Sequence, residues 1–258
     1  MKRVVKIGGR AQSDGRLPQV LAKAAASSAG AESSWLCVVH GGGDEVSALQ
    51  RQLGMEPTFR GGRRVTSPED LEVVRMVLSG TINKRLVAQL LSVGTNASGL
   101  SGEDAKLFCA HVNERDAMGR VGREIEVNPA VVQALLRAGF VPVISPVARD
   151  ADDPEGSGLN VNGDDAAAAL AVALRADELV LVADVTGVLD GGAVIASLDA
   201  IAAQRLIENG IAAGGMVAKL EAGLLALRGG VTTVRVASLD GICEPSAGTR
   251  LVHSYSNA

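Results

Sequence analysis

Two lysines of this sequence, Lys6 and Lys219, each lie beside a pair of glycines. The glycines are Gly8 and Gly9 after the first lysine, and Gly214 and Gly215 before the second. Glycine lets backbone N–H groups approach an anion closely, and lysine adds a compact positive charge. The helix expected to open at the second pair would hold Lys219 in its first turn, where the helix dipole disfavours a cation. Both places suggest an anionic ligand, and an ordinary tight turn after a strand stays an open alternative for the first.

A third glycine-rich turn lies between an apolar run at residues 35–39 and a helical pattern that starts at Asp44. Three consecutive glycines (41–43) predict a nest of backbone N–H groups backed by the helix dipole, which favours phosphate. The dinucleotide-binding fingerprint is not met, because Val46 stands where its third glycine would be. No Gly-Lys dipeptide occurs, so there is no Walker A loop. We expect His40, before the nest, to be structural rather than catalytic.

Arginines cluster ahead of the next helical pattern. Arg60, Arg63 and Arg64 lie on a glycine-containing loop, and Ser67 with Pro68 predicts the N-cap and first residue of a helix. One of the arginines could clamp a carboxylate through two hydrogen bonds. A solvated basic loop explains them equally well, so both interpretations stay open at this point.

Two asparagines precede the alanine-rich helical pattern. Asn160 and Asn162 would point the same way if their segment is extended. Asp164 or Asp165, which follow them, could cap the helix. Capping accounts for one aspartate, but not for two amides on one side of a short apolar stretch. The segment is therefore a further candidate for ligand binding.

The elements that must position these motifs alternate along the chain. Short apolar runs rich in Val and Ile predict strands at residues 3–7, 35–39, 106–110, 140–145, 178–183 and 232–238. Amphipathic patterns predict helices at residues 17–28, 44–53, 68–79, 82–92, 129–138, 165–174, 200–209 and 216–227. This alternation predicts an α/β fold, with a parallel sheet between helices on both faces. In such sheets ligands bind at the carboxyl ends of the strands, where the glycine turns and the loop 184–192 lie.

The composition excludes several classes of protein. The chain has 258 residues, a formal net charge of −4 and only five aromatic residues (Phe 3, Trp 1, Tyr 1). An acidic chain poor in aromatics is unsuited to nucleic acid, so we expect no nucleic-acid partner. Three widely spaced cysteines predict neither a disulfide framework nor a zinc site. The longest apolar run, 166–174, is too short to span a membrane. We expect a soluble cytoplasmic protein with no membrane association.

Taken in order, the motifs resemble the amino-acid kinase family over nearly the whole chain. The matching segments are 6–9, 40–43, 64–66, 79–84, 99–102, 160–164, 184–188 and 214–219. The resemblance implies a three-layer α/β/α sandwich with a largely parallel central sheet. It is strongest to members that phosphorylate the side-chain carboxylate of N-acetyl-L-glutamate with ATP and Mg²⁺ in arginine biosynthesis. Residues 1–175 would bind the amino-acid substrate and mediate dimerisation, and residues 176–258 would bind ATP, with a soft boundary between them.

The resemblance also implies roles for single residues. Lys6 and Lys219 would flank the transferred phosphoryl group as catalytic residues, and Asp164 would orient both lysines. The implied substrate-binding residues are Gly42, Gly43, Arg64, which would clamp the α-carboxylate, Asn160, which would hold the amide end, and Asn162. The implied nucleotide- and phosphate-binding residues are Gly8, Gly9, Gly42, Gly43, Asp184, Val185, Thr186, Gly187, Val188, Leu189, Gly214, Gly215 and Met216. No residue is assigned to Mg²⁺. A carboxylate acceptor is already ionised at pH 7, so the transfer needs no general base.

Two alternatives use the same scaffold. A kinase for 2-aminoadipate or glutamate linked to an acidic carrier protein would need a basic surface, such as Arg60, Arg63 and Arg64. A non-catalytic amino-acid or nucleotide sensor would not require two lysines and an aspartate. Arg10 departs from the family, which usually has a small residue after the glycines. We also expect a homodimer without arginine feedback, because the sequence begins almost at its first strand, whereas arginine-inhibited members carry an additional N-terminal helix.

Overall fold

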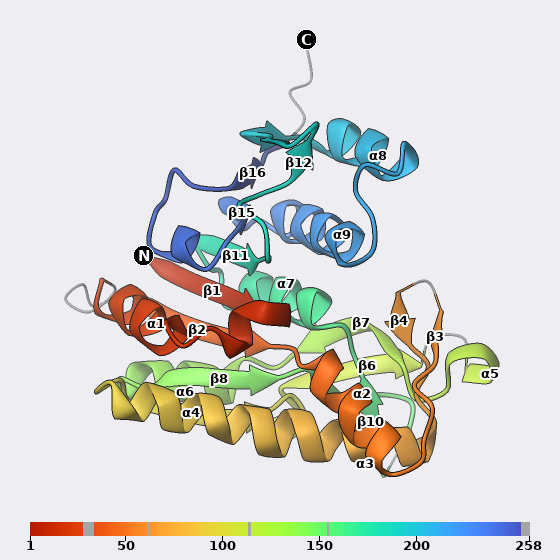
Figure 1. Cartoon of the computed structure of the whole chain (residues 1–258). Helices are drawn as coiled ribbons and strands as arrows, with labels where there is room; N and C mark the ends of the chain where they lie inside the picture. Colours follow the sequence, from red (N-terminus) through yellow and green to blue (C-terminus); the bar gives the residue numbers. More distant parts are fainter. Residues whose placement is uncertain (28–33, 61, 113–114, 154, 254–258) are drawn as a thin grey trace.

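The computed structural model describes residues 1–27, 34–60, 62–112, 115–153 and 155–253. Eight strands form the central sheet, and every neighbouring pair in it is parallel except β15 and β16 (Figure 1). In spatial order the strands are β14 (Ser197–Leu198), β16 (Thr249–Leu251), β15 (Thr233–Ala237), β11 (Glu178–Val182), β1 (Lys2–Ile7), β2 (Trp35–His40), β8 (Val141–Ser145) and β5 (Ala97–Ser101). The largely parallel central sheet expected from the sequence is confirmed.

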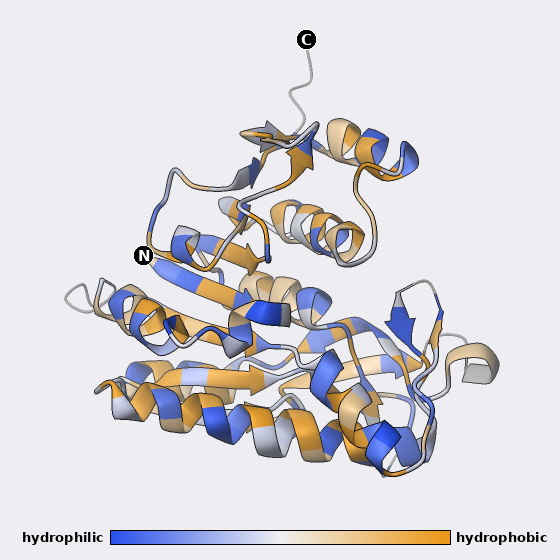
Figure 2. Ribbon diagram, viewed as in Figure 1, coloured by the Kyte–Doolittle hydropathy of each residue, from blue (hydrophilic) through white to orange (hydrophobic). Residues whose placement is uncertain are grey.

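Helices cover both faces of this sheet. One apolar cluster joins the sheet to α1 (Leu17–Ala26), α2 (Gly43–Gln52), α3 (Pro68–Arg75) and α4 (Asn83–Ser92). The other joins it to α6 (Ala130–Arg137), α7 (Gly163–Ala173), α8 (Ala200–Glu208) and α9 (Gly215–Arg228). Successive strand residues serve opposite clusters, as a pleated strand requires: Val4 belongs to the second cluster and Val5 to the first. Figure 2 shows the resulting apolar strands between helices with hydrophilic outer faces. The three layers are therefore α, β and α.

A second, four-stranded sheet stands apart from the central one. It consists of β10 (Gly158–Asn160), β9 (Val147–Asp150), β6 (Phe108–Val112) and β7 (Gly122–Val127). The strand expected at 106–110 is therefore not part of the central sheet, because β6 pairs with β7 and β9 in the second sheet. The sheet position was filled instead by β5, which the sequence did not predict. Gly99 weakens the strand pattern of this segment, yet the position requires glycine, because a Cβ there would lie 1.9 Å from Asn83 Oδ1 of α4.

The helices predicted at 68–79 and 82–92 form one continuous helical stretch. Met76–Ile82 is π-helical and joins α3 directly to α4. The start of this stretch follows the sequence closely: Ser67 Oγ accepts a hydrogen bond from the backbone N–H of Asp70, and Pro68 is the first helical residue. Among the helices of the described ranges, none is both long enough and apolar enough to cross a membrane.

The remaining elements are short. Two hairpins pair β3 (Phe59–Arg60) with β4 (Arg63–Arg64), and β12 (Leu189–Asp190) with β13 (Ala193–Val194). A short helix, α5 (Arg115–Met118), and three 3₁₀ turns at Gly9–Ser13, Asp104–Lys106 and Asp240–Ile242 complete the described elements. β1 pairs with β11, so the sheet runs without a break across the boundary expected near residue 175. The division of labour between the two halves stays a prediction.

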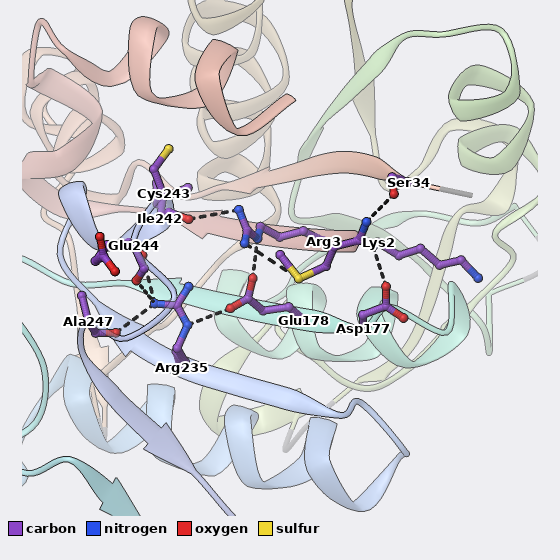
Figure 3. Close-up of polar contacts among 12 residues, drawn as sticks. Lys2, Arg3, Ser34, Asp177, Glu178, Arg235, Ile242, Cys243, Glu244 and Ala247 are labelled. Atoms are coloured by element: carbon purple, nitrogen blue, oxygen red, sulfur yellow. Dashed lines mark hydrogen bonds and ion pairs between the residues drawn. The ribbon is translucent and has the colours of Figure 1, made fainter. Parts of the chain in front are cut away.

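A buried group of charges closes the amino-terminal end of the central strands (Figure 3). Glu178 accepts a hydrogen bond from Arg3 Nε on Oε2 and another, of 2.7 Å, from Arg235 Nε on Oε1. We call these three residues the arginine cluster. Their guanidinium groups also donate to backbone carbonyls, those of Ile242 from Arg3 and of Gly241, Glu244 and Ala247 from Arg235. The cluster thus fastens the segment 241–247 to three neighbouring strands.

Candidate active site

Two lysines and one aspartate meet at the carboxyl end of the central strands. Lys6 Nζ lies 3.1 Å and Lys219 Nζ 3.0 Å from the same oxygen, Asp164 Oδ1. We call these three residues the lysine cluster. Lys6 comes from the end of β1, Asp164 is the second residue of α7, and Lys219 is the fifth residue of α9. The sequence predicted Lys219 within the first turn of this helix. In the structure it lies just beyond that turn.

Burial and mutual charge set the protonation of this cluster. Burial opposes ionisation of Asp164, but the two ammonium groups outweigh it and hold the pKa of the carboxyl below its usual value. Burial, followed by the positive charge of Lys6, lowers the pKa of Lys219 to about 8, although Asp164 acts in the opposite direction. One carboxylate thus holds two cations side by side, and the group carries a net positive charge at neutral pH.

Two cavities meet beside the lysine cluster. The first cavity, of about 250 Å³, lies under the β3–β4 hairpin and is lined by the glycine turn 41–43, Arg64, Asn160 and Asn162 among others. The second cavity, of about 350 Å³, is lined by Asp164, Lys219 and the ends of β11 and α9. Lys6, Gly8 and Gly9 line both cavities. Ligands in the two cavities would therefore face each other across one lysine and two glycines.

The glycine turn after β2 lies at the amino end of α2. Gly42 is the N-cap, with φ at +149°, and a Cβ there would lie 2.1 Å from Ile82 Cδ1 in the π-helical stretch. Only glycine fits both that backbone conformation and that contact. Gly42 and Gly43 line the first cavity, where the unsatisfied N–H groups of a helix start favour an anion.

Arg64 is a buried cation whose contacts are neutral. Its Nη2 donates to the carbonyl of Gly43 and to Ser47 Oγ, both at 2.7 Å, and its Nη1 donates to Gln50 Oε1. Burial lowers the pKa of Arg64, but an arginine stays protonated in proteins. Among the described residues no carboxylate forms an ion pair with it, and the negative charges that favour its protonated form, those of Asp70 and Asp44, act without direct contact. A ligand carboxylate would supply a counter-charge in direct contact.

The two asparagines line the same cavity but have different local duties. Asn160 Nδ2 donates to Thr66 Oγ1 at 3.0 Å, which holds the amide beside the loop that follows Arg64. Asn162 is the N-cap of α7, because its Oδ1 accepts from the backbone N–H of Asp164 and of Asp165. The cap is therefore the asparagine rather than an aspartate, and Asp164 is left to hold the lysines.

The loop after β11 is only partly at the second cavity. Asp184 and Val185 line it, and so do Gly215 and Met216 at the start of α9. Four further residues of the loop and Gly214, all expected to bind nucleotide, are outside its lining: Thr186, Gly187, Val188, Leu189 and Gly214. The fold accounts for two of them, because the backbone N–H of Val188 donates to Thr249 Oγ1 and Leu189 pairs within the β12–β13 hairpin.

Several residues at these cavities were not predicted. The first cavity has an apolar wall that includes Phe59, Val74, Leu78 and Val121, which come from four separate elements or loops. The guanidinium carbon of Arg64 lies 4.8 Å from the centroid of the Phe59 ring, a cation–π contact. Phe59 is one of only three phenylalanines in the chain, and its closeness to the arginines was the sole available indication.

Comparison with known proteins agrees with this architecture. The sequence model of the family described as "Amino acid kinase family" matches residues 1–238 of this chain. Proteins named acetylglutamate kinase are similar along most of their length: that of Chloroflexus aurantiacus is 44% identical over 84% of this chain and 85% of its own. That of Methanopyrus kandleri is 45% identical over 80% and 87%, and that of Roseiflexus castenholzii 41% over 93% and 91%.

Solved structures give the same result for the fold. The protein smu.665 from Streptococcus mutans UA159 superposes with a TM-score of 0.84 at 28% identity, covering 98% of both chains. A carbamate kinase from Giardia superposes with a TM-score of 0.70 at 15% identity, covering 98% of this chain and 99% of its own, which shows likeness of fold alone. With a family match over most of its length, a relative at 44% identity and the matching fold, this chain belongs to the amino acid kinase family.

Proposed function

We propose that this chain transfers the γ-phosphoryl group of ATP to the side-chain carboxylate of N-acetyl-L-glutamate, a step of arginine biosynthesis. The products are N-acetyl-L-glutamyl 5-phosphate and ADP. The observation that carries the proposal is the meeting of two cavities at Lys6, Gly8 and Gly9, beside the lysine cluster. A transfer between two ligands requires their reacting ends to be held adjacent. The similarity to proteins named acetylglutamate kinase supplies the identity of the ligands.

In this proposal the acceptor occupies the first cavity. The guanidinium of Arg64 pairs with the α-carboxylate, and the amide of Asn160 with the acetamido group. The acceptor's side-chain carboxylate then points toward the glycine turn and Lys6. Because a carboxylate is ionised at neutral pH, no residue has to remove a proton from it. Position and charge are what the site contributes.

The nucleotide occupies the second cavity, with its phosphates toward Gly8, Gly9 and the lysines. Lys6 and Lys219 neutralise the charge that builds on the transferred phosphoryl oxygens, and Asp164 holds both ammonium groups at the place where that charge develops. The side chains of this cavity's lining that would face a base are aliphatic, Val182, Val185 and Met216 among them. Adenine would therefore rest on apolar walls rather than between aromatic rings.

The donor groups fit a magnesium ion held mainly by phosphates and water. Within the part of the chain that the structure describes, no three His, Cys, Asp or Glu residues are grouped to hold a metal. Asp164 is engaged by two ammonium groups, which leaves Asp184 as the carboxylate of the second cavity able to contact an ion. Magnesium commonly keeps several waters and takes one or two carboxylates besides the phosphates. When bound, it would neutralise phosphate charge alongside the lysines.

The structure weakens the case for an acidic carrier protein as substrate. That alternative rests on a basic surface formed by three arginines. Arg64 is buried, and Arg63 Nη1 forms a 2.9 Å ion pair with Asp165 Oδ2, so of these three arginines only Arg60 is exposed. A single exposed arginine offers little charge complementarity to an acidic carrier protein. This favours the free amino acid as the substrate.

The direct test is formation of an acyl phosphate. The purified chain is incubated with ATP, Mg²⁺ and N-acetyl-L-glutamate, and the product is trapped with hydroxylamine as the hydroxamate. We expect product with N-acetyl-L-glutamate, and little with glutamate, 2-aminoadipate or a carrier-linked substrate. Absence of product from N-acetyl-L-glutamate, in protein shown to be folded, would reject the proposal.

Arg64→Lys tests the assignment of the first cavity. Loss of a bidentate, charge-assisted contact should raise KM for N-acetyl-L-glutamate about 10- to 100-fold, with a smaller effect on KM for ATP. Arg16→Lys is the matched control, because Arg16 pairs with Asp14 and Asp240 on the surface.

A homodimer in the cytoplasm stays a prediction, and light scattering on the purified chain tests its dimeric state.

A further inference from the structure

One backbone carbonyl joins the two glycine turns that meet at the candidate active site. The oxygen of Gly41 accepts hydrogen bonds from Gln12 Nε2 and His40 Nδ1, both at 2.9 Å. Gln12 Nε2 also lies 3.4 Å from the carbonyl oxygen of Ile7, and the N–H of Gly41 donates to that same oxygen at 2.8 Å. Gln12 therefore bonds to the end of β1 and to the turn after β2 at once.

The His40 side of this arrangement is firmly set. The ring is fully buried, and burial lowers the pKa of His40 to about 4, so the imidazole is neutral. Its Nε2 lies 3.2 Å from Asn83 Nδ2, a donor, which requires Nε2 to accept and places the ring proton on Nδ1. Asn83 is itself held by a 2.9 Å bond to the carbonyl of Val143. The proton on His40 Nδ1 is thereby directed to the Gly41 oxygen.

A held carbonyl also sets the direction of the next N–H. In a trans peptide the C=O of Gly41 and the N–H of Gly42 lie in one plane and point in opposite directions. A peptide between two glycines rotates easily because neither residue has a Cβ to restrict it. With the Gly41 oxygen held by two side chains, rotation of this peptide would break two buried hydrogen bonds.

We propose that Gln12 is a positioning residue, which together with His40 locks the Gly41–Gly42 peptide so that the Gly42 N–H faces the transferred phosphoryl group. This inference rests on the proposed function, because it assigns that N–H to a developing negative charge. The lock costs no reorganisation during the reaction, which is what makes a preset donor effective. Gln12 itself lines neither cavity, so its effect passes through the backbone of Gly41.

The test replaces Gln12 by Met, which keeps the length of the side chain and removes its donor. We expect kcat to fall about tenfold, the usual size for one lost hydrogen bond. The dissociation constants for N-acetyl-L-glutamate and a non-hydrolysable ATP analogue should change less than twofold. Affinity for ADP with fluoroaluminate and N-acetyl-L-glutamate, which imitates the transferred phosphoryl group, should fall by the same factor as kcat. If Gln12 had only a structural role, its replacement would weaken the binding of all three ligands by similar factors.

His40→Asn and His40→Phe supply the second pair. Asparagine retains a donor near the position of Nδ1 and should keep more of the activity than phenylalanine, which retains none. Gln204→Met is the matched control, because Gln204 is an exposed residue of α8 that bonds to Glu208. It should change none of these values.

Two results would overturn the inference. One is unchanged kcat in folded Gln12→Met, and the other is a loss of kcat matched by equal losses of ground-state binding. If the unaltered chain forms no acyl phosphate, the proposed function fails instead. The lock is then decided by the amide resonance of Gly42 in ¹⁵N-labelled protein, which should shift or broaden in Gln12→Met and not in Gln204→Met. An unmoved resonance would reject the lock itself.

Discussion

The two ends of the central sheet each bury one carboxylate between two cations, yet the two groups are built differently. In the arginine cluster, Arg3 and Arg235 bind different oxygens of Glu178. In the lysine cluster, both ammonium groups share Oδ1 of Asp164. β1 contributes a residue to each cluster, Arg3 near its start and Lys6 at its end. The same charges on the same strand therefore serve two different purposes.

The difference lies in what remains to be bonded. The guanidinium groups of the arginine cluster donate to four backbone carbonyls besides Glu178. Among the buried side-chain nitrogen and oxygen atoms of the described residues, only Arg235 Nη2 has no hydrogen-bond partner. The ammonium groups of the lysine cluster share the carboxylate of Asp164 and face open cavities. A charge group bonded mainly to the protein's own backbone holds the fold together, whereas one that faces a cavity can act on a ligand.

Glu178→Gln should have the largest effect, and it should be on stability. It removes the only negative charge between two buried guanidinium groups, which costs about 3–5 kcal/mol of the free energy of unfolding. Urea unfolding measures the loss, and Glu45→Gln is the control, since Glu45 pairs with Arg85 on the surface and should cost at most about 1 kcal/mol. We expect the folded fraction of Glu178→Gln to keep its kcat. Equal losses in both variants would remove the distinction between a buried cluster and a surface pair.

Lys6→Ala should show the reverse. Asp164 keeps Lys219 as its partner and no longer holds two like charges together, so the loss of stability should be smaller than in Glu178→Gln. In the proposed function the lost charge acts on the phosphoryl group, so kcat should fall about 10²- to 10³-fold, as for loss of one oxyanion donor. Steady-state kinetics and a thermal melt on the same sample separate the two effects. Lys23→Ala, on the exposed face of α1, is the control, and near-normal turnover in Lys6→Ala would contradict the assignment.

The pH dependence distinguishes the clusters without a mutation, because arginine does not titrate and lysine does. Since the pKa of Lys219 is lowered to about 8, kcat/KM for ATP should fall about tenfold per pH unit above pH 8. Stability should respond with the opposite sign. Between pH 8 and the ordinary lysine value of about 10.4 the unfolded chain binds the extra proton, so this group's contribution to stability rises with pH. Lys219→Arg should lose the alkaline limb, and persistence of that limb would assign it to another group.

The smallest expected effect concerns the support of the lysine cluster. Asn162→Ala removes the N-cap of α7, the helix that carries Asp164, and should cost about 1 kcal/mol of stability. Asp199→Ala removes the N-cap of α8 and should cost a similar amount. Only the first should also raise KM for N-acetyl-L-glutamate, because Asn162 lines the first cavity. If both variants raised this KM equally, the change in KM would follow from the loss of stability and not from a contact between Asn162 and the substrate.

The sequence predicted the lysine cluster better than the arginine cluster for a physical reason. Lys6 and Lys219 stand next to glycine pairs, and a strand, a glycine turn and a helix are local features that a sequence displays. Arg3 and Glu178 are 175 positions apart and become neighbours only through the register of β1 on β11. Nothing in their surroundings announces that register, so the arginine cluster was not foreseen.

Competition between local roles explains the remaining differences. Either aspartate of the 164–165 pair is a good helix cap in isolation, and only the folded chain shows that Asn162 takes that role. Gly99 of β5 leaves room for the side chain of Asn83, and a glycine lowers the resemblance of the segment to a strand. No local pattern distinguishes Gln12, because its two acceptors lie at the ends of different strands and come together only in the folded chain.

The wall shared by the two cavities has a practical consequence. Lys6, Gly8 and Gly9 line both sides of it, and a glycine has no side chain to stand between two ligands. One compound that joins an amino-acid carboxylate to a nucleoside polyphosphate through a short linker would therefore meet little obstruction at the junction. Tethering makes the second binding event intramolecular and can raise affinity far above that of either half. Bisubstrate compounds are accordingly a rational starting point for inhibitors of this chain.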